Sequence, residues 1–309
     1  MTQDPERIAK RLARAGIASR REAERIIEEG RVAVNGRRID SPALNVLPGD
    51  VITLDGKPIA EPEPVRMWRY HKPAGLVTTT ADEKGRKTIF DALPEDMPRV
   101  MSVGRLDLSS EGLLLLTNDG DLKRRLELPS TGWLRKYRVR AKGEPTVDML
   151  EPLRKGMTID GERFAPMQVE IDRQQGANAW LTIGLREGRN REIRRALEAV
   201  GLEVNRLIRI SYGPFQLGEL PRGAVEEIRP KVLRDQLGIK REPDKPAPKA
   251  PEKPAPKART VARPGAKPKP GKPGPDAPRP GKPPVRGGAK GGAPRGAGPK
   301  GARPGRTRS

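Results

Sequence analysis

The sequence predicts an α+β protein with three parts: a small N-terminal module, a larger mixed domain and a basic C-terminal tail. Helical patterns followed by short strands and tight turns indicate the module. Strands and helices intermixed along the chain indicate the larger domain. An abrupt change to Pro, Lys, Gly, Ala and Arg indicates the tail. We assign residues 6–60 to the module, 65–237 to the larger domain and 240–309 to the tail.

The module is predicted to contain two helices followed by a small sheet. Residues 19–22 read Ser-Arg-Arg-Glu, the spacing of a helix N-cap and its acidic partner. Gly30 stands where a glycine commonly ends a helix. Residues 32–34 form an apolar run before Asn35-Gly36, a pair typical of tight hairpin turns. A further short strand is expected at residues 51–54.

The larger domain follows a proline-containing linker at residues 61–64, where alternating prolines disfavour both helix and central strand. Alternating or continuous apolar patterns predict its strands, and apolar residues at helical spacing predict a helix that Gly201 ends. The predicted strands are residues 67–72, 113–116, 137–141 and 179–185, and the predicted helix is residues 191–200.

The tail carries most of the excess charge. The chain has 62 Lys and Arg against 40 Asp and Glu, a net charge of +22, and residues 240–309 hold 20 basic and 4 acidic residues. A segment with so few apolar residues cannot offset its ordering entropy, so we expect it to be disordered. Its one-sided charge favours a nonspecific arm that tethers RNA over a merely solubilising tail.

Composition also excludes several kinds of site. The chain has no cysteine and one histidine, His71. Disulfides, thiolate zinc sites, cysteine nucleophiles and metal sites built on several histidines are therefore excluded. No apolar run approaches the roughly 18 to 20 residues that span a bilayer, and residues 1–6 are polar, without a signal-peptide core. We expect a cytoplasmic protein without membrane association.

The N-terminal module resembles an S4-type RNA-binding domain. The likeness rests on Leu12, Gly16 and two stretches, which read SRREA at residues 19–23 and GRVAVNG at residues 30–36. In such a domain Arg20, Arg21 and Arg31 would lie at a helix end and an adjacent turn, where they could contact phosphates together with free helix N–H groups.

The larger domain resembles the pseudouridine synthases, in particular the ribosomal RNA branch that carries an S4 domain ahead of the catalytic one. Within that family it is most similar to the large-subunit synthase B branch. Five stretches carry the likeness, in the order found in the family: KPAG at 72–75, GRLDLSSEGLLLLTNDG at 104–120, KYRV at 136–139, EGRNREIRR at 187–195 and LIRISYGP at 207–214. The resemblance to this family implies that the larger domain has a mixed, mainly antiparallel β-sheet.

The resemblance implies an enzyme that detaches uracil from its ribose, turns it and rejoins it through carbon C5. It implies no cofactor and no metal, and it places the nucleophile at Asp107 and the active-site tyrosine at Tyr137. It leaves open whether Asp107 attacks the sugar or the base. A carboxylate nucleophile must stay ionised, and the resemblance assigns the stabilising cation to Arg194. Arg189, Arg191 and Arg195 lie close by in sequence and remain alternatives.

Further roles follow from the same resemblance. Leu207 would close the pocket by packing, and Arg105 would fill the gap that the target nucleotide leaves in its stack. Lys72, Arg189 and Arg191 are expected to contact RNA. His71 is given no catalytic role.

Two further interpretations compete with the enzyme. A ribosome-assembly or RNA-chaperone factor would equally use the module and tail, but it would have little reason to keep Asp107, Tyr137 and Arg194 together. An aminoacyl-tRNA synthetase is disfavoured because no nucleotide-binding signature is found. The expected partner is ribosomal RNA, with 23S RNA preferred, free or in an assembling subunit, and we expect a monomer.

Overall fold

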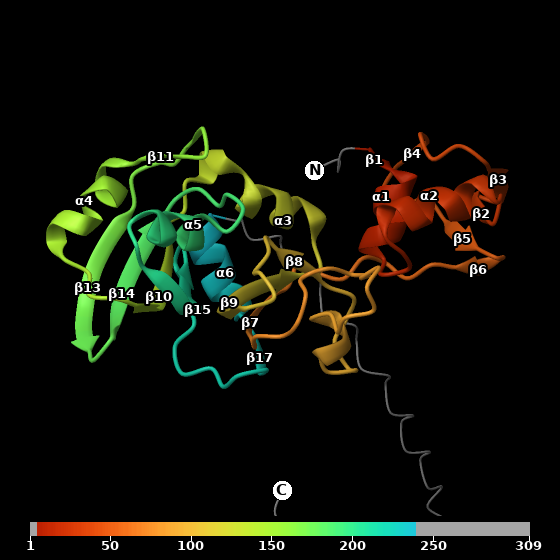
Figure 1. Ribbon diagram of the computed structural model, residues 1–309. Helices are drawn as coiled ribbons and strands as arrows, with labels where there is room; N and C mark the ends of the chain where they lie inside the picture. Colours follow the sequence, from red (N-terminus) through yellow and green to blue (C-terminus); the bar gives the residue numbers. More distant parts are fainter. Residues whose placement is uncertain (1–4, 239–309) are drawn as a thin grey trace, which may run out of the picture. The chain divides into compact units, whose positions relative to one another are not determined.

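A computed structural model of the chain describes residues 5–238. Figure 1 shows the course of the backbone through a helical N-terminal module and a larger domain built around a sheet. The prediction of a disordered tail at residues 240–309 lies outside the described residues. None of the helices at residues 5–238 is long and apolar enough to cross a membrane.

The N-terminal module contains the two predicted helices and small sheets. Its elements are β1 (Glu6–Arg7), α1 (Ile8–Arg14), α2 (Arg20–Glu28), β2 (Val32–Val34), β3 (Arg37–Ile39), β4 (Asn45–Val46), β5 (Ile52–Leu54) and β6 (Lys57–Pro58). A four-stranded sheet has the order β3-β2-β5-β6, and β1 pairs with β4. Ser19 caps α2 by accepting from the backbone N–H of Glu22, as predicted. Asn35 and Gly36 both have positive φ, which fits the predicted hairpin turn.

The larger domain is built on a nine-stranded sheet. Its main path is β13-β14-β10-β15-β9-β7-β17; β8 pairs with β9, and β16 with β15. All of these pairs are antiparallel except β15 with β9. The strands are β7 (Met67–Lys72), β8 (Met101–Val103), β9 (Ser110–Thr117), β10 (Arg135–Lys142), β13 (Gln168–Gln175), β14 (Asn178–Leu185), β15 (Glu203–Tyr212), β16 (Phe215–Gln216) and β17 (Val225–Glu227). The expected mixed, mainly antiparallel sheet is confirmed.

Helices cover both faces of this sheet. They are α3 (Gly120–Glu127), α4 (Val147–Lys155), α5 (Glu192–Ala199) and α6 (Pro230–Leu237); 3₁₀ turns Phe90–Ala92 and Pro129–Thr131 and a hairpin of β11 (Thr158–Ile159) and β12 (Glu162–Arg163) complete the domain. Along β9, Leu114 and Leu116 enter one apolar cluster with α4 and α5, whereas Leu113 and Leu115 enter a second with α3 and α6. Successive strand residues point to opposite faces, so β9 is buried on both sides.

Candidate active site

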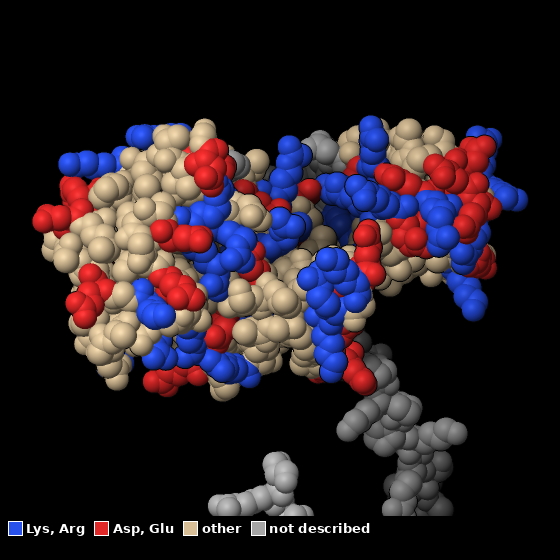
Figure 2. Space-filling view, viewed as in Figure 1, with Lys and Arg blue, Asp and Glu red and all other residues tan. Residues whose placement is uncertain are grey.

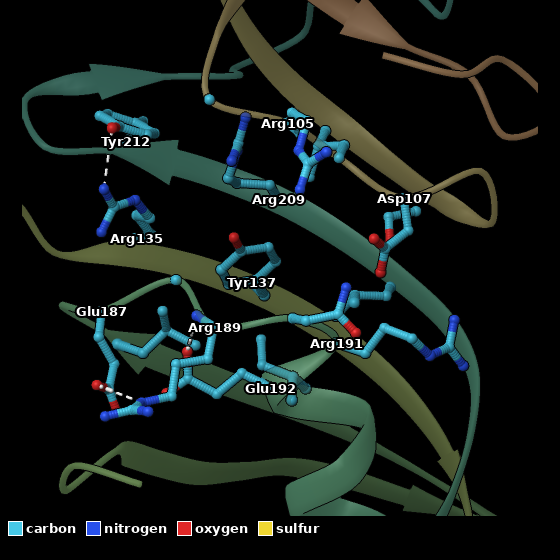
Figure 3. A pocket seen from close by; sticks show the side chains of 18 of the residues that line it. Arg105, Asp107, Arg135, Tyr137, Glu187, Arg189, Arg191, Glu192, Arg209 and Tyr212 are labelled. Atoms are coloured by element: carbon cyan, nitrogen blue, oxygen red, sulfur yellow. Dashed lines mark hydrogen bonds and ion pairs between the residues drawn. The ribbon is translucent and has the colours of Figure 1, made fainter. Parts of the chain in front are cut away.

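The larger domain contains a cavity of about 870 Å³. Its wall is formed by the loop between β8 and β9, by β10 and β15, and by the loop between β14 and α5 (Figure 3). The sequence-predicted residues that line it are Arg105, Asp107, Tyr137, Arg189, Arg191 and Leu207. The cavity therefore brings together residues that lie up to about a hundred positions apart in sequence.

Asp107 lies in the β8–β9 loop. Hydrogen bonds to the backbone atoms of this loop hold it in place. The carbonyl of Leu106 accepts from the Thr78 hydroxyl at 2.8 Å, and the carbonyl of Leu108 accepts from the N–H of Gly75 at 2.8 Å. The N–H of Ser110 donates to the carbonyl of Asp107 at 3.0 Å. These bonds fix the backbone of Asp107 while its half-buried side chain faces the cavity (Figure 3).

Lys72 was expected to contact RNA, and this expectation is wrong. Its side chain is fully buried under the Asp107 loop. The ammonium donates to the carbonyls of Pro73, Asp107 and Ser110 at 3.0, 3.2 and 2.9 Å. Burial lowers the pKa of this ammonium to about 8, against the opposing charges of Asp107 and Glu111. Because all three donors are engaged inside the protein, Lys72 supports the loop instead of reaching a phosphate.

Tyr137 and Leu207 come from the adjacent strands β10 and β15. Tyr137 is paired in register with Ile183 of β14 and Arg209 of β15, and its ring lies in the cavity wall with little exposure. Its hydroxyl points into the cavity (Figure 3). Leu207 is buried beside it, opposite Ser110 at the one parallel contact of the sheet. The sheet thus places an aromatic ring and an apolar side chain next to the Asp107 loop.

Arg194 does not form the direct ion pair with Asp107 that we expected. Its guanidinium donates to the carbonyls of Val204 at 3.0 Å and Ser109 at 3.2 Å, which ties α5 to the Asp107 loop. Burial lowers the pKa of Arg194, Arg191 lowers it further, and the charge of Asp107 opposes both. The two charges therefore attract each other at longer range, and Arg194 lies behind the cavity wall instead of lining it.

The loop between β14 and α5 is held by ion pairs. The Arg189 side chain contacts Glu162 at 2.7 Å and Glu187 at 2.9 Å, so much of its hydrogen-bonding capacity is used within the protein. Arg191 ends the loop with φ of +49°, an uncommon conformation for a residue with a side chain. Such strain is often found at functional sites.

A buried carboxyl that the sequence did not single out lies at the start of α5. Glu192 is 4% exposed and lines the cavity, and one of its oxygens accepts from the N–H of Arg189 at 2.9 Å. Its other oxygen is buried without a partner. Burial, together with the smaller effect of the neighbouring Glu187 carboxyl, raises the pKa of Glu192 to about 7. In sequence it looked only like an acidic residue in the first turn of a helix, a common surface position.

The basic residues predicted for the module differ in their surroundings. Arg20 and Arg21 are exposed. Arg31 forms a forked pair with the Asp55 carboxylate at 3.0 and 2.6 Å and also contacts Glu29. Figure 2 shows further basic side chains gathered on the larger domain over the region of α5 and β15. Among residues 5–238, no cluster of acidic residues and histidine suited to a metal ion is found.

The cavity places an aspartate and a tyrosine together among arginines, an arrangement that suits an enzyme acting on a polyanion such as RNA. Residues 66–199 match the RNA pseudouridylate synthase family, and residues 6–52 match the S4 domain. An uncharacterized RNA pseudouridine synthase of Rickettsia felis is 48% identical over 228 residues, which cover 74% of this chain and 99% of the relative. The chain belongs to the RNA pseudouridine synthases, which isomerise uridine in RNA.

Other similarities agree with this assignment. A ribosomal large subunit pseudouridine synthase B of Salmonella typhi is 43% identical over 230 residues, covering 72% of this chain and 79% of the relative. A crystal structure of a pseudouridylate synthase superposes with a TM-score of 0.54 at 24% identity, covering 75% of this chain and 99% of that chain. The likeness to this crystal structure shows the fold alone. The sequence-based resemblance to the S4-containing synthases is confirmed.

Proposed function

We propose that this enzyme converts a specific uridine of ribosomal RNA, in the 23S RNA of the large subunit, to pseudouridine with Asp107 as the nucleophile. The observation that carries the proposal is that Asp107 and Tyr137 face one cavity, from a loop and a strand that independent hydrogen bonds hold in place. The 43% identity to a large subunit synthase B supports the choice of RNA.

In the proposed reaction, Asp107 attacks the nucleotide and the bond between the ribose C1′ and uracil N1 breaks. The uracil turns within the cavity, a new bond forms between C1′ and C5, and the bond to Asp107 breaks again. The proton on C5 is then lost and N1 gains one, so the reaction is an isomerisation that needs no outside reductant or oxidant. The Tyr137 ring can stack on the base, and its hydroxyl can take part in the proton transfer.

The surrounding residues would support this step. The positive charges of Arg194 and Lys72 both attract the carboxylate of Asp107. Leu207 would keep water from the base. Arg105 is exposed at the rim, where its planar guanidinium could occupy the place of the extruded base.

RNA recognition would be divided between the parts of the chain. Arg20, Arg21 and Arg31 of the module, with Arg189 and Arg191 at the cavity, would contact the RNA. The residues 240–309 would add a sequence-independent attraction to phosphates. We propose that the enzyme acts as a monomer in the cytoplasm, on free RNA or on an assembling subunit.

The proposal is tested by mapping pseudouridine in total ribosomal RNA. Cells would carry the intact protein, no protein, Asp107→Asn, or the control Asp148→Asn, which changes an exposed carboxylate in the first turn of α4. We expect one 23S site to be lost in the deletion and with Asp107→Asn, and kept with Asp148→Asn. Loss of ribosome assembly in the deletion with every site unchanged would instead identify a binding factor.

A further inference from the structure

Two arginines flank one aromatic ring in the wall of the cavity, away from Asp107. The guanidinium carbon of Arg135 lies 4.6 Å from the centroid of the Tyr212 ring, and that of Arg209 lies 5.3 Å from it. Arg135 donates to the Tyr212 hydroxyl at 3.0 Å, and this hydroxyl donates to the carbonyl of Leu126 at 2.9 Å (Figure 3). The ring is therefore fixed, and it holds both guanidinium groups in place.

Neither arginine is neutralised within the described part of the chain. Arg135 donates only to the carbonyl of Arg186 and to the Tyr212 hydroxyl. Arg209 is 2% exposed and donates from Nε to the carbonyl of Leu113 at 2.7 Å, and its Nη2 is buried without a partner. A buried cation without a counter-ion is costly to fold, and such unsatisfied groups commonly mark a binding function.

The position of these arginines limits what the anion can be. Arg209 is the register partner of Tyr137, so it lies one strand away from the ring proposed to stack on the target base. Arg105 lines the same cavity and adds a third positive charge. A polyanionic chain whose base enters the cavity necessarily brings its own phosphates alongside.

We infer that Arg135 and Arg209, arranged on Tyr212, form a binding site for one backbone phosphodiester of the substrate RNA, next to the nucleotide whose base enters the cavity. The inference rests on the proposed function for the identity of the polyanion. Arginine suits this role because its fork matches two phosphate oxygens. The phosphate supplies the counter-ion that Arg209 lacks and fixes how far the target nucleotide enters.

The test measures binding by the full-length chain carrying Asp107→Asn, so that no turnover is needed. The probe is an RNA stem-loop containing the uridine found by mapping or, if mapping finds none, a uridine-containing 23S fragment. The variants Arg135→Gln and Arg209→Met are compared with the control Arg173→Gln, which removes an exposed charge on β13. We expect Kd to rise about tenfold for each cavity variant, and the slope of log K against log salt to fall by roughly 0.7 to 0.9, the effect of one lost phosphate contact.

A set of probes with a neutral methylphosphonate at single positions identifies the phosphate. One substitution should weaken binding by the protein that keeps both arginines about tenfold, and weaken binding by the Arg135→Gln protein less, since one of the two arginine contacts is already absent there. If no single position narrows the difference in Kd between the two proteins, the inference is wrong. Arg135→Gln keeps the buried Arg209, so the test remains decisive if Arg209→Met fails to fold. Absence of pseudouridine formation would overturn the proposed function and leave this binding result standing.

Discussion

Gly112 is expected to be among the least replaceable residues of the domain. It has φ of +103°, and a Cβ there would lie 2.3 Å from the carbonyl oxygen of Arg209 and 2.6 Å from its nitrogen. Gly112 and Arg209 are register partners where β9 and β15 run parallel, so the side chain would force the two strands apart. Those strands position Asp107 and Leu207, which makes the contact important for the cavity as well as for the fold.

The cost of Gly112→Ala has two contributions. The unfavourable φ costs about 1 to 3 kcal/mol, and displacing packed backbone adds about 1 to 3 kcal/mol. We therefore expect a free energy of unfolding lower by about 4 kcal/mol, which in a domain of this size lowers Tm by roughly 8 to 16 °C. Tryptophan fluorescence reports this domain alone, since Trp68, Trp133 and Trp180 all lie in it.

The control is Gly85→Ala. Gly85 has φ of +65° but no atom within 4 Å of the added Cβ, so it carries the backbone cost without the collision. We expect it to lose only about 1 to 2 kcal/mol. If both variants unfolded at the same temperature, the proposed collision with Arg209 would be refuted. Folded Gly112→Ala at low temperature should also lose most synthase activity, whereas Gly85→Ala should keep it.

Three further predictions concern single contacts. Lys72→Met should lower the free energy of unfolding by about 2 to 4 kcal/mol, because three buried or half-buried carbonyls lose their donor; urea unfolding indistinguishable from the parent would contradict this. Since burial raises the pKa of Glu192 to about 7, the folded state binds more protons than the unfolded one between about pH 4.5 and 7, and stability falls as pH rises through that range, by at most about 3 kcal/mol. Glu192→Gln should remove this decline. If urea unfolding at pH 5 to 8 gave free energies of unfolding that change with pH in the same way for both proteins, the prediction would be contradicted. Ser19→Ala should cost about 1 kcal/mol through loss of the α2 cap, seen as faster amide exchange in α2 and not in α5.

The sequence predicted those elements whose pattern follows from burial. The four leucines at 113–116 indicated a buried strand, and they lie at the centre of β9. The alternating residues 137–141 lie within β10, residues 179–185 within β14, and the predicted helix 191–200 contains α5. The strand at residues 67–72 is β7 without change. In each case one or both faces pack against the core, which imposes a regular pattern on the sequence.

Elements without such a pattern were missed for identifiable reasons. Strand β13 lies at the end of the sheet and is mostly exposed, so polar residues occupy both of its faces. Helix α4 contains Pro152, which sequence reasoning treats as a helix breaker. The triplet Asn118-Asp119-Gly120 looks like a turn in sequence, yet the Asp119 carboxylate caps α3 by accepting from two backbone N–H groups. One pattern, Asn-Asp-Gly, serves both turns and helix starts.

The same limit applies to the electrostatics of Asp107. The family resemblance assigned one arginine to Asp107 as its stabilising cation, but a likeness in sequence does not show how far a side chain reaches. In the structure, Lys72 and Arg194 each attract the carboxylate while their own donors bind backbone carbonyls of the loop that carries it. A forked contact to either cation would occupy both carboxylate oxygens. Because both cations donate to carbonyls instead, an oxygen of Asp107 stays free to attack the nucleotide, which is what the proposed nucleophile requires.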